Sequence, residues 1–414
     1  MAASLAWGQV HGRILDQQLD QNHQGYTVLQ VWGSHYQMGY AHGFLRADHI
    51  AAAVAELKAW LGPRYPQLRK MVATTIWKPP AIEQELDGMV AALARLHPRS
   101  GIDKLDLKLA NTQGDWSYAC RSHACWGRFV AEPIKTLISR RLDYSTPLRA
   151  SYHHVLCAWI ANDSSPAWVN WAWPGMVTVT TAVNEYGTLV ALHDYHSRAG
   201  TVPPRAMPRM VAARYALTMP VRPDPAEQLR AVYAELRRYP AMTGGFLNYF
   251  APQGYGGVMT SSRQRGFYHL RRPQPSYFRR QVLITTNAWT DGTYSPEGGK
   301  FMADYYAAGG KTLASHWALM GDTGMHKMSV AYRGRADMTI WVDGRLPAGR
   351  TPRLQWQWKD LTCIRPGPRS HPARTSQARP ERSAVHAKAK PPEPPCPSPR
   401  PAGMIDRGRQ GDPQ

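Results

Sequence analysis

The chain has 414 residues, with 50 Lys and Arg against 29 Asp and Glu, so its formal charge is +21 at pH 7. Its 43% hydrophobic content and 15 tryptophans can bury a sizeable core, which excludes global disorder, and five cysteines in this length exclude a disulfide scaffold. The positive charge is compatible with nucleic acid, an acidic surface or an anionic substrate as partner.

No run of 18 uncharged apolar residues occurs, so we expect no membrane span. The first sixteen residues, MAASLAWGQVHGRILD, lack both a charged n-region and an apolar h-region of useful length. This predicts the absence of a signal peptide and makes the cytoplasm the default location, although a start site assigned too late would conceal such a signal.

The first third of the chain reads as one strand followed by helices. A β-branched and aromatic run predicts a strand at 26–32, and apolar residues at helical spacing predict helices over about 47–61 and 80–96. Gly39 and Gly43 are four residues apart, so they share a helix face that we expect to pack closely against a sheet.

The rest of the chain is predicted to be mostly β, with two more helices. A hairpin is expected over 177–195 around Asn184-Glu185-Tyr186-Gly187; the helices are expected at 205–218 and 225–238, and strong strands at 281–286 and 336–342. This order favours an α+β layered fold over a doubly wound βαβ fold.

Residues 361–414 differ in composition from the rest. They hold ten Lys and Arg, four acids and twelve prolines, without apolar periodicity. We therefore predict a disordered Pro/Arg-rich tail; a basic nucleic-acid-binding arm is the alternative interpretation.

The densest cluster of reactive side chains is the segment 114–127, GDWSYACRSHACWG. Cys120, His123 and Cys125 resemble half of a metal site, but no second Cys/His pair has zinc-like spacing. The alternative is one nucleophilic cysteine, Cys120, whose neighbouring arginines favour the thiolate.

Four motifs occur in order along the chain. A small residue precedes Cys-x-Ser-x-Ala-x-Trp-Gly, and Arg-x-x-Asp-Tyr follows about twenty residues later. A Gly-x(5)-Gly-x(3)-Gly segment, an Asn-Glu-x-Gly hairpin and a strand ending in Thr-Asn lie at 33–43, 181–187 and 283–287. Together these motifs, over roughly residues 26–360, resemble the penicillin acyltransferase family (peptidase family C45) of N-terminal-nucleophile hydrolases, with acid-ceramidase-like amidases and bile-salt hydrolases as more distant relatives.

The resemblance implies a four-layer αββα sandwich and self-cleavage between Ala119 and Cys120. It makes 1–119 the N-terminal α chain and 120–360 the nucleophile-bearing β chain, which remain associated. Cys120 would attack an N-acyl amide and form a thioester, which water hydrolyses or a second amine takes up. The resemblance implies no metal or organic cofactor and no nucleic acid partner.

The resemblance also assigns roles to the other site residues. Arg140 would favour the thiolate, Asp143 would orient the new α-amino group, and Asn184 and Asn287 would donate to the oxyanion. The gap between Cys120 and Arg140 is a few residues longer than is usual among relatives, so Arg141, where relatives usually have Asn, is the alternative functional arginine.

Other polar and aromatic groups have simpler interpretations. Cys125 and Cys157 are expected to pack in the core; the tryptophans are expected to be core or, alternatively, walls of an acyl pocket, namely Trp159, Trp168, Trp171 and Trp173. Two rival functions stay open: a metal-dependent hydrolase that uses His193, Asp194, His196 and perhaps His123, and a non-catalytic basic binding protein.

Overall fold

The computed structural model describes residues 10–113, 119–143, 148–194, 202–254, 256–261, 268–271, 281–286 and 304–364. The chain divides into two units, Met1–Thr362 and Cys363–Gln414, and the fold described below is that of the first. None of the described helices is both long and apolar enough to cross a membrane.

The first sheet has nine strands, which run in the order β1-β2-β5-β6-β7-β8-β9-β10-β11. All neighbours pair antiparallel except β2 and β5, which pair in parallel. The strands are β1 (Gly12–Leu19), β2 (Gly25–Gly33), β5 (His153–Ala161), β6 (Trp168–Ala172), β7 (Thr181–Asn184), β8 (Leu189–Asp194), β9 (Gly245–Phe250), β10 (Gly256–Ser261) and β11 (Tyr268–Arg271).

The second sheet is antiparallel and has the order β12-β3-β4-β13-β14-β15, with β16 also pairing with β14. Its strands are β12 (Val282–Thr286), β3 (Ala119–Trp126), β4 (Thr136–Asp143), β13 (His326–Gly334), β14 (Asp337–Leu346), β15 (Gly349–Arg350) and β16 (Leu354–Gln357). The β3–β4 pair therefore lies inside the sheet, with β12 on one side and β13 on the other.

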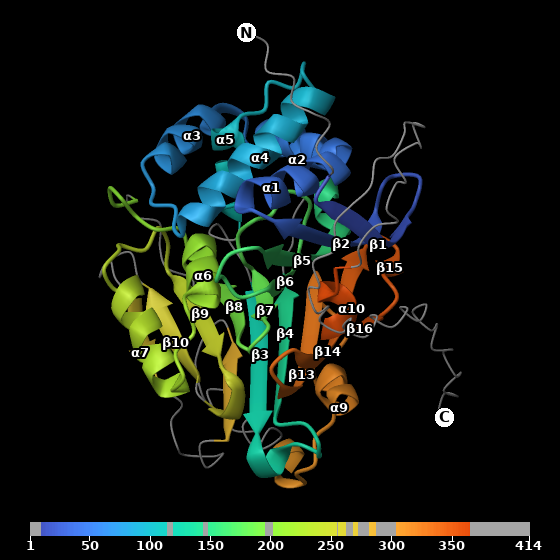
Figure 1. The fold of residues 1–414 in the computed structure, drawn as a ribbon, viewed down its shortest axis with the longest axis vertical. Coiled ribbons are helices and arrows are strands. Elements are labelled where there is room, and N and C mark those ends of the chain that lie inside the picture. Colours follow the sequence, from blue (N-terminus) through green and yellow to red (C-terminus); the bar gives the residue numbers. More distant parts are fainter. Residues whose placement is uncertain are drawn as a thin grey trace, which may run out of the picture. The chain divides into compact units, whose positions relative to one another are not determined.

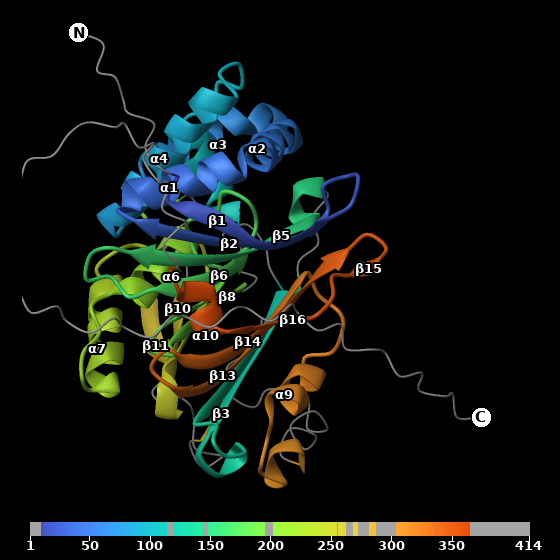
Figure 2. The same ribbon diagram turned by 45° about the vertical axis from the view of Figure 1, so that its right-hand side comes forward.

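Most of the helices lie on the outer faces of the two sheets, as Figures 1 and 2 show, whereas Trp358 and Leu361 of the last helix pack in the apolar cluster between the sheets. They are α1 (His35–Leu45), α2 (Ala47–Leu61), α3 (Tyr65–Ala73), α4 (Pro80–Leu96), α5 (Lys104–Ala110), α6 (Arg209–Thr218), α7 (Pro225–Leu236), α9 (Leu313–Leu319) and α10 (Trp358–Thr362). In Figure 2, α1 to α4 cover the sheet that contains β1, β2, β5 and β6, and α9 lies beyond the other sheet.

Three apolar clusters hold these layers together. Val28 and Trp171 of the first sheet pack with Ile340 of the second in the space between the sheets. Leu29, next to Val28, points the opposite way and packs with α1, α2, α4 and α6. A third cluster joins α9 to the outer face of the second sheet. The order helix–sheet–sheet–helix confirms the predicted α+β sandwich, because each sheet buries both of its faces.

The helices and strands expected from periodicity are confirmed, except that the helix expected at 205–218 begins at Arg209 and the hairpin expected from 177 begins at Thr181. One expectation about packing is also corrected. Gly39 and Gly43 lie on α1, but the close contact is with α4 rather than with a sheet. A Cβ at Gly39 would lie 1.9 Å from the carbonyl oxygen of Glu85, and one at Gly43 would lie 2.9 Å from the Cα of Met89. Glycine spacing predicted a close approach correctly, but it carries no information on the partner.

The C-terminal boundary of the folded unit lies slightly beyond residue 360. Leu361 still belongs to the folded unit. It is fully buried in α10, and its carbonyl oxygen accepts a 2.7 Å hydrogen bond from Gln30 Nε2. The remainder of the predicted tail, from 365 onward, lies outside the described residues.

Candidate active site

Cys120 is the second residue of β3, at the end of the strand pair where the second sheet meets the first. Its side chain is 5% exposed, and in register it faces Leu142 of β4. Cys120 and Leu142 both belong to the apolar cluster that also contains Leu192 of β8. The strand thus points the thiol at the first sheet, in a water-poor environment.

Arg140 of β4 binds the thiol directly. Its Nη2 lies 3.0 Å from Cys120 Sγ and 2.8 Å from the carbonyl oxygen of Leu192. The arginine is completely buried, and its Nε and Nη1 have no hydrogen-bond partner among the described residues. A buried guanidinium against sulfur favours the thiolate over the thiol, which is the state needed for nucleophilic attack.

Asp143 lies at the end of β4 and is held by Arg141. Arg141 Nε is 2.7 Å from Asp143 Oδ1, and its Nη2 donates to Oδ2 at 2.9 Å, in a bidentate ion pair. Asp143 is also the register partner of Ala119, the residue before Cys120. The two neighbouring arginines therefore divide the site between them: Arg140 contacts the sulfur, whereas Arg141 contacts the carboxylate.

The structure does not bring Asn184 to Cys120. Its Oδ1 accepts from the backbone of Tyr186 and Thr188, both at 3.1 Å, and its Nδ2 donates to the carbonyl of Leu217 at 2.9 Å, so the side chain holds the β7–β8 turn together. Leu192, whose carbonyl binds Arg140, lies level with Thr180. From there to Asn184 is four residues, or roughly 13 Å along a strand.

The expected role of Asn184 as an oxyanion donor is therefore corrected to that of a turn residue. Asn287, the other predicted donor, lies outside the described residues. The last residue of β12, Thr286, pairs with Arg121 of β3.

Two further polar pairs line the same face of the second sheet and were not predicted. Ser122 Oγ lies 2.7 Å from His193 Nε2, and both side chains are fully buried. His326 of β13 is the register partner of Leu142, so Cys120, Leu142 and His326 form a row across three strands. Only the spacing of Ser122, two residues after Cys120, was a signal that sequence alone could have supplied.

His326 belongs to a buried imidazole pair. Its Nε2 is 2.7 Å from Nδ1 of His154, whose Nε2 lies 2.7 Å from the carbonyl oxygen of Arg345. Burial lowers the pKa of His154 to about 4, and burial, with His154 and Arg140 nearby, lowers the pKa of His326 well below its usual range. Both rings are therefore neutral at physiological pH and leave Arg140 as the charged group facing the sulfur.

The residues of the metal-site alternative do not converge in the part of the chain that the structure describes. His193 contacts Ser122 on the inner face of β3, whereas His123 points to the outer face, where its ring lies 6.5 Å from that of His316. The side chain of Asp194 and the whole of His196 lie outside the described residues. No group of three His, Cys, Asp or Glu suited to a metal ion occurs within the described ranges.

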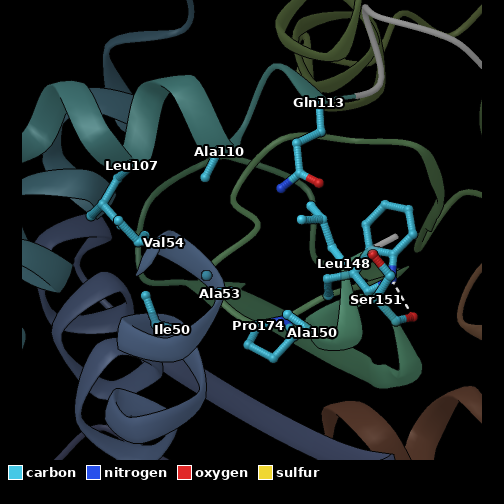
Figure 3. A pocket seen from close by; sticks show the side chains of 12 residues that line it. Ile50, Ala53, Val54, Leu107, Ala110, Gln113, Leu148, Ala150, Ser151 and Pro174 are labelled. Carbon is cyan, nitrogen blue, oxygen red and sulfur yellow. Dashed lines mark hydrogen bonds between the residues drawn. The ribbon is translucent and has the colours of Figure 1, made fainter. Parts of the chain in front are cut away.

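A small, mainly apolar hollow lies between α2, α5 and the segment after β6 (Figure 3). Ile50, Val54, Leu107 and Leu148 form its walls, and Gln113 and Ser151 are its polar members. Trp173 also lines it, and the Trp173 ring lies 4.6 Å from the ring of His326. Trp159, Trp168 and Trp171, in contrast, are core residues.

No protein-family model matches the sequence, and no curated protein matches it. Among solved structures, the chain is similar to the Caenorhabditis elegans N-acylethanolamine-hydrolyzing acid amidase (NAAA) ortholog. The two share 11% sequence identity with a TM-score of 0.37, and the match covers 51% of this chain and 92% of the other. This likeness is distant, and the proposal that follows rests on the chain's own residues.

Proposed function

We propose that this protein is a self-processing cysteine hydrolase or acyltransferase that acts on an N-acyl amide. The observation that carries the proposal is the 3.0 Å contact between the buried Arg140 guanidinium and Cys120 Sγ at the start of β3. A thiol placed against a permanent cation, at the first positions of a strand inside a two-sheet sandwich, is suited to nucleophilic attack.

The first proposed reaction is cleavage of the chain itself. Cys120 Sγ attacks the carbonyl carbon of Ala119, the Ala119–Cys120 peptide bond breaks, and a thioester joins the two residues. Water then hydrolyses this thioester, which regenerates the thiol and leaves a free α-amino group on Cys120. Such an amine has a pKa of about 7.7–8.0, so it can act as a base near neutral pH.

The same thiol then attacks the external substrate. The α-amine takes the proton of Cys120, the thiolate adds to the amide carbonyl, and the C–N bond breaks as the proton passes to the leaving amine. The resulting thioester is resolved by water or by a second amine. Arg140 stabilises the thiolate, and its unpartnered Nη1 and Nε supply donors beside the developing charge.

Asp143 acts in this scheme as a positioning residue. It lies opposite Ala119 in register, and the ion pair with Arg141 fixes its orientation. A fixed carboxylate beside the new ammonium on Cys120 would hold that group toward the sulfur. Asn287 stays a proposed oxyanion donor on the resemblance of its motif alone.

The apolar hollow supports an acyl group as the part of the substrate that is recognised. Its walls are aliphatic, and the segment that starts at Gln113 leads within seven residues to Cys120. Burying each methylene of an acyl chain there contributes about 0.8 kcal/mol to binding. We therefore expect an apolar acyl group and place fewer constraints on the amine.

Intact-mass analysis of the purified protein tests the proposal. We expect two fragments, 1–119 and 120–414, and a Cys120→Ala variant that stays whole and has no activity on a panel of acyl amides. Cys125→Ala is the matched control, since it removes a thiol from the same strand and should be cut normally. A whole chain that hydrolyses acyl amides with Cys120→Ala in place would refute the mechanism.

A further inference from the structure

A buried arginine, Arg46, stands at the junction of α1 and α2, away from Cys120. It is 3% exposed and occupies the position before the first residue of α2. Its Nη1 donates to Gln17 Oε1 at 2.7 Å, and its Nη2 lies 2.8 Å from His49 Nδ1 and 3.4 Å from His153 Nε2. The guanidinium is thus enclosed by β1, α2 and the start of β5.

Every partner of Arg46 is neutral. Its Nε has no hydrogen-bond partner, and no carboxylate of the described residues forms an ion pair with it. The carboxylate that acts on it electrostatically, Asp48, is 84% exposed at its side chain and is bound to His97 at 2.9 Å. A buried cation without a counter-ion is costly, and burial accordingly lowers the pKa of Arg46 to about 10.

The imidazoles around Arg46 form a row that leads to the surface. The His153 ring is buried and lies 4.2 Å from the half-buried His49 ring, which lies 5.2 Å from the exposed His23. Burial, Arg46 and His23 together lower the pKa of His49 to about 4, and the same effects of burial and Arg46 lower that of His153. Arg46 and three histidines, all of which carry or can gain a positive charge, are therefore neighbours in the structure.

We propose that Arg46, His49 and His153 form a binding site for a tetrahedral oxyanion, such as inorganic phosphate or the phosphoryl group of a larger molecule. An anion there supplies the missing counter-charge. Its oxygens extend in several directions, which matches a guanidinium and two rings that approach from different elements. The site also lies at the amino end of α2, a helix of 15 residues, whose backbone dipole favours negative charge.

Anion binding at this place is coupled to proton uptake. In the anion-free protein, Arg46 donates to the ring nitrogens of His49 and His153, which must then be unprotonated. A bound oxyanion favours imidazolium rings, which donate to it instead. The titratable groups that face the site are His23, from the β1–β2 turn, His49 and Asp48 from α2, and His153 from β5; the neighbouring His154 points to the other face of the sheet and pairs with His326.

Isothermal titration calorimetry of the full chain with sodium phosphate, at constant ionic strength and pH 6.5, tests the site. We expect saturable binding, a heat that changes with the ionisation enthalpy of the buffer because protons are taken up, and a similar response to sulfate. Acetate at the same concentration should bind at least tenfold more weakly. Arg46→Gln should weaken phosphate binding at least tenfold.

The matched control is Arg64→Gln, because Arg64 is an exposed arginine near the other end of α2 that packs over Trp60. This variant and Cys120→Ala should bind phosphate like the parent protein, so the test is independent of the proposed reaction. If Arg46→Gln fails to fold, His49→Phe serves in its place and should weaken binding as well. Absence of saturable binding to the parent protein, or equal responses to phosphate, acetate and chloride, would overturn the site.

Discussion

Cys120 and Cys125 lie on the same strand, five residues apart, and therefore point to opposite faces of the second sheet. Cys120 Sγ meets the guanidinium of Arg140 at 3.0 Å, whereas Cys125 Sγ lies 3.5 Å from Nε2 of His316. His316 is also bound to Tyr306 and Ser139, and burial lowers its pKa to about 3.

Both thiols are buried, but their neighbours give them opposite chemistry. Burial raises the pKa of the Cys125 thiol, and the neutral His316 ring beside it does not counter that effect. Cys120 instead has a guanidinium, that of Arg140, as its partner. We therefore expect the cation beside Cys120, and not a neutral histidine such as the one beside Cys125, to favour the reactive thiolate.

The largest expected difference between the two thiols is in processing. Cys120→Ala should abolish chain cleavage and reduce amide hydrolysis at least 10³-fold, because the thioester cannot form. Cys125→Ala should be cut and active, with a loss of about 1 kcal/mol in stability from the small cavity. Intact mass, a hydrolysis assay and urea unfolding distinguish the two variants, and equal activity of both would contradict the assignment.

The next largest difference is expected between substitutions of Arg140 and Arg141. Arg140→Gln removes the cation from the sulfur, so we expect a loss of about 10²–10³ in kcat and a shift of thiol alkylation by iodoacetamide to higher pH, since the thiolate is no longer favoured. Arg141→Gln leaves the sulfur contact intact and should leave the alkylation profile near that of the parent. An unshifted profile for Arg140→Gln would mean that the 3.0 Å contact has no electrostatic effect.

The outer-face histidine allows a test of stability against pH. His316 is neutral in the fold, with a pKa near 3, while an unfolded histidine has a pKa of about 6.5. The unfolded state therefore binds the extra proton, so this group's contribution to stability is complete above pH 6.5 and falls as the pH drops below it. From pH 7 to pH 5 the loss is about 2 kcal/mol.

His316→Gln should reduce the slope of unfolding free energy against pH in this window by about one proton. Urea unfolding at several pH values measures it. An unchanged slope would show that the ring is protonated or exposed in the fold. The hydrolysis rate per folded, processed molecule at pH 7 should change little, because His316 lies on the face opposite Cys120.

The smallest effect on catalysis is expected at Asn184. Asn184→Ala loses three hydrogen bonds in a buried turn, so stability should fall by about 1–3 kcal/mol while kcat stays within a factor of two. Thermal unfolding together with kcat at a temperature where the variant is folded measures both quantities. A loss of 100-fold in kcat without a loss of stability would restore the oxyanion role that we have withdrawn.

Much of the secondary structure was predictable because the apolar spacing is strong in 80–96 and β-branched residues dominate 281–286. The strands β3 and β4 were harder to predict from periodicity. Their sequences, ACRSHACW and TLISRRLD, place polar groups on both faces, and a buried arginine or serine resembles a surface residue until its partner is known.

The sequence by itself determined the chemical candidates: a cysteine preceded by a small residue, two arginines, an aspartate and the turn that follows Asn184. Only the tertiary structure decided which partner each of these side chains contacts. Side chains of a strand alternate between faces, so adjacent Arg140 and Arg141 reach different partners, and register sets which end of β8 lies beside the sulfur. The same holds for His326, which pairs with His154 172 residues away in the chain, and for Arg46, one of whose partners, His153, is 107 residues away.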